Sequence, residues 1–272
     1  MTEERGPLHV TGELLATKRI GAHHHLTVVA RGVPERFRPG TFVAVSTGAE
    51  RLARRPLWIH RVRPTGGYGA TLELVVEERG PGTRWLVSQP AGTRLDVIGP
   101  LGRPFSLPKE PVACVLVGEG YAAGPLFPLA ERLRERGCAI TMVLVAPDEA
   151  HLLSALEARR SARAVTVVTA DGSVGQRGSV ADVLDETLER AGAAVVYAAG
   201  PDEVLHAAAA AAERAGAWSQ VALERPMACA TGLCHGCTVP VAGEGGHTRL
   251  VRSCTEGPVL RGDRVVWDGG EA

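Results

Sequence analysis

Four of the six cysteines lie between residues 229 and 254, and their spacing constrains the fold more than any other feature of the sequence. Cys229, Cys234 and Cys237 follow the pattern C-x4-C-x2-C, and Cys254 comes later. Plant-type [2Fe-2S] clusters are held by thiolates at this spacing, three on one tight loop and the fourth on a separate segment. We therefore predict that these four cysteines are metal ligands in a small C-terminal domain.

Two other interpretations of the cysteine site remain open. Structural zinc sites also use four thiolates, although they usually carry two C-x2-C pairs and this segment has one. Four thiols without a metal are the third alternative. His235 lies between two of the cysteines, but Rieske-type ligation needs two histidines, so we expect His235 to be a solvent-facing loop residue. Cys114 and Cys138 lie in apolar segments and are expected in the core.

Charge and composition exclude several classes of protein. The 30 Lys and Arg residues balance the 30 Asp and Glu residues, and only 4% of the residues are aromatic, so no basic or stacking surface for nucleic acid is indicated. No apolar run approaches the roughly 20 residues that a membrane span needs. The N-terminal residues MTEERG lack the apolar core of a signal peptide. We expect a cytoplasmic protein with no nucleic-acid partner and no membrane span.

The residues before the cysteine segment show two different patterns of apolar residues. Short apolar segments separated by Gly and Pro favour a small antiparallel barrel or sandwich; they lie at 25–30, 41–46, 57–62, 71–76 and 93–98. Strand-like runs then alternate with helical periodicity, which predicts a parallel sheet covered by helices on both faces. The strands are expected at 112–117, 139–145, 164–169 and 193–198, and the helices at 126–133, 152–156, 183–188 and 204–212. The predicted fold class is therefore β-barrel plus α/β, with domains at 1–108, 109–223 and 224–272.

Three consecutive histidines, His23 to His25, lie in the barrel region. Side chains of an extended strand alternate between its two faces, so the three imidazoles cannot all reach one ion. We expect them to be exposed loop or strand residues.

The chain resembles the electron-transfer subunits of class 1B dihydroorotate dehydrogenase, within the ferredoxin-NADP reductase superfamily. The resemblance rests on RRPLWI at 54–59, LDVIGPLG at 95–102, DGS at 171–173, ERPMACATGLCHGC at 224–237 and CTEGPV at 254–259. It also includes the pairs Gly82-Thr83 and Gly200-Pro201. These segments follow the family's order over nearly the whole chain.

The resemblance implies three cofactors and the residues that bind them. Residues 1–108 would be an FAD-binding barrel, 109–223 an NAD(P)-binding domain and 224–272 the [2Fe-2S] domain. Arg55 would contact the FAD pyrophosphate, and Gly82 and Thr83 would offer donors at a helix start. The expected FAD-binding residues are Arg55, Pro56, Leu57, Trp58, Val75, Val76, Glu77, Gly82 and Thr83; Gly118, Gly120, Gly200 and Pro201 are expected to bind NAD(P)H.

The sequence departs from the family at several of these positions. Trp58 replaces a small hydroxyl residue that faces the flavin, and Glu77 replaces a basic or polar one. In the Gly-rich loop after Val117, Glu119 replaces the middle one of three glycines and brings a carboxylate toward the phosphates. Ala199 replaces a cysteine that the family often places beside the nicotinamide.

Two functions follow as hypotheses. The first is an oxidoreductase component that passes electrons from NAD(P)H through FAD and the [2Fe-2S] cluster to a redox partner. By the resemblance, this partner is an FMN-containing dehydrogenase subunit in a heterotetramer. The second is a repurposed or regulatory subunit that keeps its cofactors but has altered or lost NAD(P)H binding.

Overall fold

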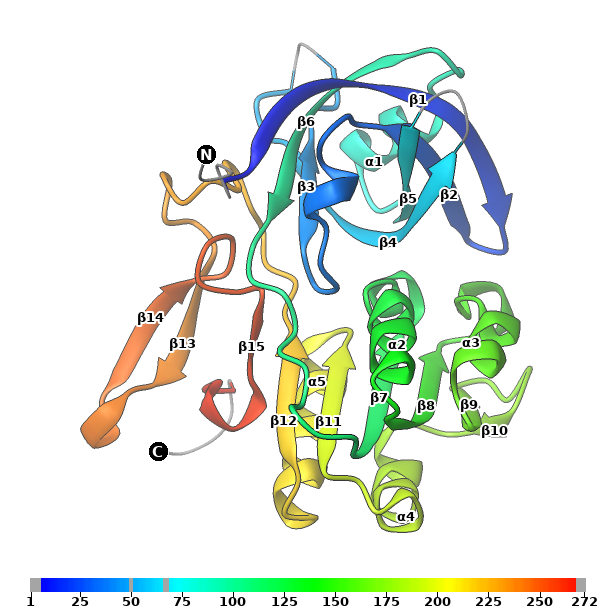
Figure 1. The fold of residues 1–272 in the computed structure, drawn as a ribbon, viewed down its shortest axis with the longest axis vertical. Helices are drawn as coiled ribbons and strands as arrows, with labels where there is room; N and C mark the ends of the chain where they lie inside the picture. Colours follow the sequence, from blue (N-terminus) through cyan, green and yellow to red (C-terminus); the bar gives the residue numbers. More distant parts are fainter. Residues whose placement is uncertain (1–5, 49–50, 66–68, 268–272) are drawn as a thin grey trace.

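The computed structural model describes residues 6–48, 51–65 and 69–267, which form a barrel, a larger sheet and a C-terminal hairpin (Figure 1). The barrel is closed by six antiparallel strands in the order β1-β2-β5-β4-β3-β6. Their bounds are β1 (Leu8–Ile20), β2 (His23–Val29), β3 (Phe42–Val45), β4 (Arg55–Thr65), β5 (Gly69–Glu77) and β6 (Arg94–Leu101). A short helix, α1 (Pro81–Val87), follows β5. The predicted antiparallel barrel is confirmed.

The first barrel strand, β1, is not among the strands that the apolar segments predict. Only Gly12 and Leu14 are buried in the 13 residues of β1. The strand pairs with β2 and β6, so its backbone hydrogen bonds close the barrel although its side chains bury little apolar surface.

The second part is a seven-stranded sheet in the order β10-β9-β8-β7-β11-β12-β15. All neighbours pair in parallel except β12 and β15, which are antiparallel. The strands are β7 (Ala113–Glu119), β8 (Ala139–Ala146), β9 (Ala164–Thr169), β10 (Gln176–Arg177), β11 (Val195–Ala199), β12 (Trp218–Ala222) and β15 (Val259–Arg261). The helices are α2 (Leu126–Glu135), α3 (Ala155–Ser161), α4 (Ala181–Ala191) and α5 (Asp202–Arg214).

Alternate residues of β7 point into separate apolar clusters on the two faces of the sheet. Cys114 and Leu116 pack with residues of α2 and α3, and Val115 and Val117 pack with residues of α4 and α5. Helices therefore cover both faces, as expected for a parallel sheet. The helix expected at 152–156 begins only at Ala155, and Leu156 is exposed. No helix among the described residues is long and apolar enough to cross a bilayer.

The C-terminal segment is joined to the sheet. After the cysteine loop, β13 (Thr238–Ala242) and β14 (Thr248–Arg252) form a hairpin. β15 then adds to the large sheet beside β12, as Figure 1 shows. The segment after residue 223 thus contributes one edge strand to the preceding domain.

The histidine tract differs from the expectation. The side chains do alternate, because His23 and His25 share one face of β2 while His24 pairs with Glu78 on the other, 3.0 Å away. The expected exposure of the tract is wrong, since His23 and His25 are only 1% and 9% exposed. This face of the barrel packs against the sheet domain: His23 Nε2 lies 2.9 Å from the carbonyl oxygen of His151.

Candidate functional site

Two cavities meet between the barrel and the sheet domain. The first has a volume of about 360 Å³ and the second of about 530 Å³. Both are lined by Glu77, Arg79, Tyr121, Glu224 and Arg225, so a ligand in one cavity can touch a ligand in the other. Each volume falls within the range typical of small-molecule sites, about 300–1,000 Å³.

The first cavity brings together most of the residues expected to bind FAD. Its walls come from β4, β5, the start of α1 and the segment after β12. Eight of the expected residues line it: Arg55, Pro56, Leu57, Trp58, Val75, Val76, Glu77 and Thr83. Most of the remaining wall is apolar and includes Phe42, Leu223 and Met227. A mainly apolar slot with the Arg55 guanidinium at one edge suits a flavin ring joined to a pyrophosphate.

Arg55 and Gly82 are in close contact at one edge of this cavity. Arg54, the neighbouring residue, pairs with Asp96 at 3.0 Å, whereas none of the described carboxylates pairs with Arg55. A Cβ atom at Gly82 would lie 2.9 Å from two guanidinium atoms of Arg55 and closer still to its Nε. The absence of a side chain at Gly82 therefore leaves room for the arginine.

Thr83 has a role that the sequence does not predict. Its Oγ1 accepts hydrogen bonds from the backbone N–H groups of Gly80 and Arg79, at 3.1 and 3.0 Å. The hydroxyl therefore holds the turn that begins α1, and it lines the cavity while serving this turn.

Changing Gly82 to alanine is expected to weaken FAD binding by about tenfold or more, because the new methyl group displaces the Arg55 guanidinium from the cavity. Gly80 is a matched control in the same turn: its φ of −173° suits any residue, and a Cβ added there would have no atom within 4 Å. Flavin fluorescence on dialysis gives the affinity of each variant. Equal retention of FAD by Gly82→Ala and Gly80→Ala would contradict the assignment of Arg55.

Glu224 stands between the two cavities and holds a hydrogen-bonded group. The indole Nε1 of Trp58 donates to Glu224 Oε1 at 2.8 Å, and the Tyr121 hydroxyl donates to Oε2. Arg79 Nη1 donates to the Tyr121 oxygen at 2.6 Å. Burial raises the pKa of Glu224, and the hydrogen bonds from Tyr121 and Trp58 oppose this rise. The network fixes the Tyr121 ring where the cavities join.

The second cavity contains three of the four residues expected to bind a nicotinamide nucleotide. Gly120, Gly200 and Pro201 line it, and Gly120 has a φ of +53°, which favours glycine. Gly118 does not line it. A Cβ at Gly118 would lie 2.6 Å from the Cβ of Ala123, so this glycine allows β7 to pack against the 3-10 turn η2 (Gly120–Ala123).

Carboxylates surround much of this second cavity. Glu77, Glu119, Asp202 and Glu224 line it, and Arg79, Arg225 and His151 bring positive or titratable groups. Arg225 is already paired with Asp202 at 2.8 Å. Burial, followed by the nearby charge of Glu203, raises the pKa of Glu119. Glu119 lines this cavity, so its ionised carboxylate would repel a phosphate bound there.

The four C-terminal cysteines converge on one loop. The backbone N–H groups of Thr231 and Cys234 point at Cys229 Sγ, each at 3.4 Å. Burial opposes ionisation of Cys229, but these donors outweigh it and lower the pKa of the thiol to about 6. Cys254 lies beside Cys237 and receives the N–H of Gly232, so the fourth cysteine reaches the loop. His235 is exposed, as expected, and Cys114 and Cys138 are buried.

The sulfur atoms of the four cysteines lie in two pairs, because Cys229 neighbours Cys234 and Cys254 neighbours Cys237. In a tetrahedral zinc site all four sulfurs lie about 3.8 Å apart, as a Zn–S distance of about 2.3 Å requires. Among the described residues, the one group of three or more potential ligands within 4.8 Å is His25, His60 and Glu73, not the cysteines. A [2Fe-2S] cluster instead takes its thiolates in two pairs.

A packed path joins the first cavity to the cysteines. Met227 lines the cavity and lies two residues before Cys229. Met227, Trp58, Cys237 and Cys254 belong to one cluster of buried side chains. The cavity wall and two of the four thiols are thus parts of the same core.

Sequence reasoning did not select Arg79, Tyr121 and Glu224 as site residues. Glu224 opens the cysteine-containing segment and Arg79 lies two residues after Glu77, so both were near the expected site in sequence. Their shared role depends on contacts between residues more than 40 positions apart.

Comparison with known proteins gives a consistent result. The model of the iron-sulfur cluster binding domain of dihydroorotate dehydrogenase B matches residues 224–266. A dihydroorotate dehydrogenase B (NAD(+)) electron transfer subunit of Desulforamulus reducens is 33% identical over 85% of this chain and 87% of its own length. A homologue of that subunit from Thermotoga maritima is also 33% identical, over 87% of this chain and 80% of its own.

Solved structures share the fold. A structure of an NADH-dependent reduced ferredoxin-NADP oxidoreductase, described for flavin-based electron bifurcation, is 29% identical and has a TM-score of 0.83; the match covers 94% of this chain and 90% of the other. A ferredoxin reductase of carbazole 1,9a-dioxygenase is 17% identical with a TM-score of 0.64, covering 78% and 67%. The second similarity shows the fold alone.

Proposed function

Because this chain belongs to the family of electron transfer subunits of dihydroorotate dehydrogenase B, we propose that it carries electrons between a nicotinamide nucleotide and a catalytic partner subunit. The observation that carries this function is the continuity of the site. Two cavities share five wall residues, and the first is packed against the cysteine loop. Electrons can therefore cross the molecule through three adjoining sites.

The residues of each site suit the cofactor that we propose for it. FAD exchanges two electrons with a nicotinamide and passes them one at a time to a [2Fe-2S] cluster. Arg55 would hold the FAD pyrophosphate, and the walls of the first cavity would enclose the flavin ring. Cys229, Cys234, Cys237 and Cys254 would hold the cluster, with backbone N–H groups stabilising the thiolates.

The residues between the cavities control contact between the two ligands. Tyr121 lies at the junction and is held by Glu224 and Arg79. A nicotinamide that reaches the flavin would have to pass this ring, so Tyr121 would set the position of the nicotinamide. Gly120, Gly200 and Pro201 would form the floor of the nucleotide site, and Gly118 would support it by packing.

The partner follows from the family. We propose an FMN-containing dihydroorotate dehydrogenase subunit, in a heterotetramer of two such pairs. The exposed cysteine loop would face this partner: Leu233 is 83% exposed between Cys229 and Cys234. The domains would divide at residues 1–108, 109–223 and 224–272, with β15 returning to the second.

A second candidate function rests on Glu119. A carboxylate in the phosphate loop favours a subunit that retains FAD and the cluster but binds a nicotinamide nucleotide weakly. Such a subunit would serve assembly or redox sensing, and its electrons would come from another donor.

Co-purification with the FMN-containing subunit of the same organism tests the proposal. The complex should reduce NAD⁺ when dihydroorotate is added, and neither subunit alone should do so. If the complex oxidises dihydroorotate with an artificial acceptor but reduces neither NAD⁺ nor NADP⁺, the second candidate replaces the first. If the two subunits do not associate, the proposed partner is wrong.

A further inference from the structure

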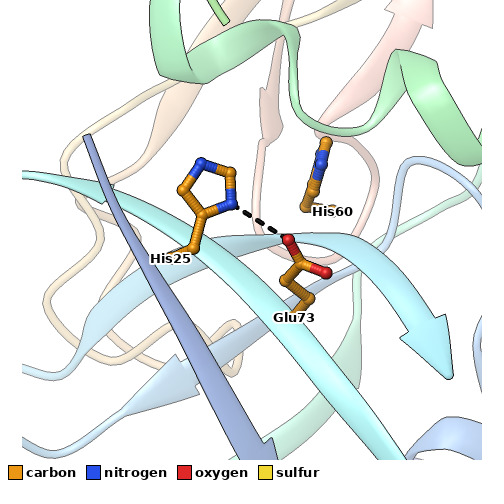
Figure 2. Close-up of side chains that lie close together, drawn as sticks. All are labelled: His25, His60 and Glu73. Carbon is orange, nitrogen blue, oxygen red and sulfur yellow. Dashed lines mark hydrogen bonds and ion pairs between the residues drawn. The ribbon is translucent and has the colours of Figure 1, made fainter. Parts of the chain in front are cut away.

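His25, His60 and Glu73 form a compact group away from the cavities and the cysteine loop. They come from β2, β4 and β5, which are adjacent in the barrel sheet. One ligand atom of each residue lies within 4.8 Å of the other two. Figure 2 shows the two imidazole rings on either side of the Glu73 carboxylate. We propose that this group binds a divalent transition metal ion of the Zn²⁺ class.

His60 is prepared for a metal by its other ring nitrogen. Its Nδ1 lies 3.1 Å from the carbonyl oxygen of Gly124, to which it can only donate, so Nε2 carries the free lone pair. The side chain is 1% exposed, and Nε2 has no hydrogen-bond partner. A histidine whose Nδ1–H is fixed by a backbone carbonyl is a common metal ligand. Burial lowers the pKa of His60 to about 4, so the ring is neutral at pH 7.

One carboxylate oxygen of Glu73 faces the two histidines, and the other faces two arginines. Oε1 lies 2.9 Å from His25 Nδ1. Arg63 and Arg61 approach Oε2 instead, at 3.2 and 3.8 Å. The hydrogen bond from His25, together with these charges, lowers the pKa of Glu73 to about 2. A metal would bind between Oε1 and His25 Nδ1 in place of that hydrogen bond, with the imidazole proton moved to Nε2, while the arginines orient the carboxylate.

The charges near the group can accommodate a cation. Arg63 is 56% exposed and can move into water, and Arg61 is paired with Glu157. Glu157 Oε2 lies 3.8 Å from His60 Nε2, so its carboxylate can complete a tetrahedral set. Two nitrogens and one or two carboxylate oxygens suit Zn²⁺ or Co²⁺.

The position of the group links the metal to the contact between domains. Phe127 of α2 packs on the His60 ring with centroids 5.0 Å apart, and Gly124 belongs to the loop after β7. A bound ion would therefore fix three barrel strands at the surface that meets the sheet domain, and would stabilise the folded chain.

The test uses the holoprotein with FAD and cluster in place, so that the cysteines are occupied. Isothermal titration with Zn²⁺ should show one equivalent per chain. Zinc-edge X-ray absorption should show only nitrogen and oxygen neighbours near about 2.0–2.1 Å. A sulfur shell near about 2.3 Å, or no binding at 100 μM Zn²⁺, would overturn the proposal.

Variants separate this group from other zinc-binding surfaces. His60→Asn keeps a donor for the Gly124 carbonyl and removes Nε2, and Glu73→Gln removes the anionic oxygen. Neither variant should bind the one equivalent of Zn²⁺. Zn²⁺ at 100-fold excess over Kd should raise the unfolding midpoint of the parent by about 5 °C, and both variants should lack this rise. His24→Asn is the matched control, because His24 faces away, and should behave as the parent. Binding that persists in both site variants would refute the assignment.

Discussion

Replacing Cys254 by serine should remove the cluster and stop electron delivery to the partner, while NADH still reduces the flavin. Cys254 is the ligand most distant in sequence, is 1% exposed and lies beside Cys237. The serine oxygen is a harder and much more basic ligand than a thiolate, so the cluster should lose its hold on the iron that Cys254 binds. We expect iron content to fall from two per chain to nearly zero, and turnover with the partner to fall at least about 100-fold.

Cys138→Ser is the control for this experiment. Cys138 is also buried, at 6% exposed, but it lies immediately before β8, far from the loop in sequence. This variant should lose some stability and keep both irons. Iron analysis, the visible spectrum and partner-coupled turnover distinguish the two. Retention of two irons with an unchanged visible spectrum in Cys254→Ser would refute the four-cysteine assignment, because a serine oxygen in place of the thiolate would alter the sulfur-to-iron absorption.

Replacing Glu119 by glutamine should lower KM for the nicotinamide nucleotide by about tenfold. One unfavourable charge near a phosphate in a partly solvated pocket costs about 1–2 kcal/mol, and glutamine removes it at nearly constant volume. The raised pKa of Glu119 adds a pH dependence. Acidification protonates Glu119 in the parent and removes its charge, so KM should fall as the pH falls, whereas Glu119→Gln should lack this part of the profile.

Glu203→Gln serves as the matched control. Glu203 raises the pKa of Glu119 but does not line the second cavity. It should change the midpoint of the pH profile slightly and leave KM at neutral pH within about twofold of the parent. An unchanged KM in Glu119→Gln would show that the carboxylate does not approach the nucleotide.

The fold could be predicted wherever a strand buries a regular set of apolar side chains. β7, β8, β9 and β11 are nearly continuous apolar runs, so their positions and their parallel arrangement follow from the sequence. β12 does not show this pattern because Ser219 and Gln220 occupy its centre. Both are 4% exposed, and Gln220 hydrogen-bonds the backbone of Ser106. The hydrogen bonds that satisfy the buried Gln220 side chain come from a residue more than 100 positions away in the sequence.

The sequence predicts the residues that would hold the cofactors, but not the hydrogen bonds that join one cavity to the other. The cysteine spacing identifies the cluster loop, and the resemblance selects Arg55 and the residues around it. The Tyr121–Glu224–Arg79 network joins residues that only the packed domains bring together. The histidine tract shows the same limit. Strand alternation separates His24 from its neighbours, but the sheet domain that buries His23 and His25 has no signal in β2 itself.

The most direct test of the account is an anaerobic titration of the purified holoprotein with NADH. If FAD and one [2Fe-2S] cluster are reduced in sequence, the flavin and cluster absorbance should both bleach, with about three electrons, or 1.5 NADH, taken up per chain. NADPH is run in parallel. Reduction of both groups by dithionite but by neither nucleotide would contradict the claim that this chain draws electrons from a nicotinamide.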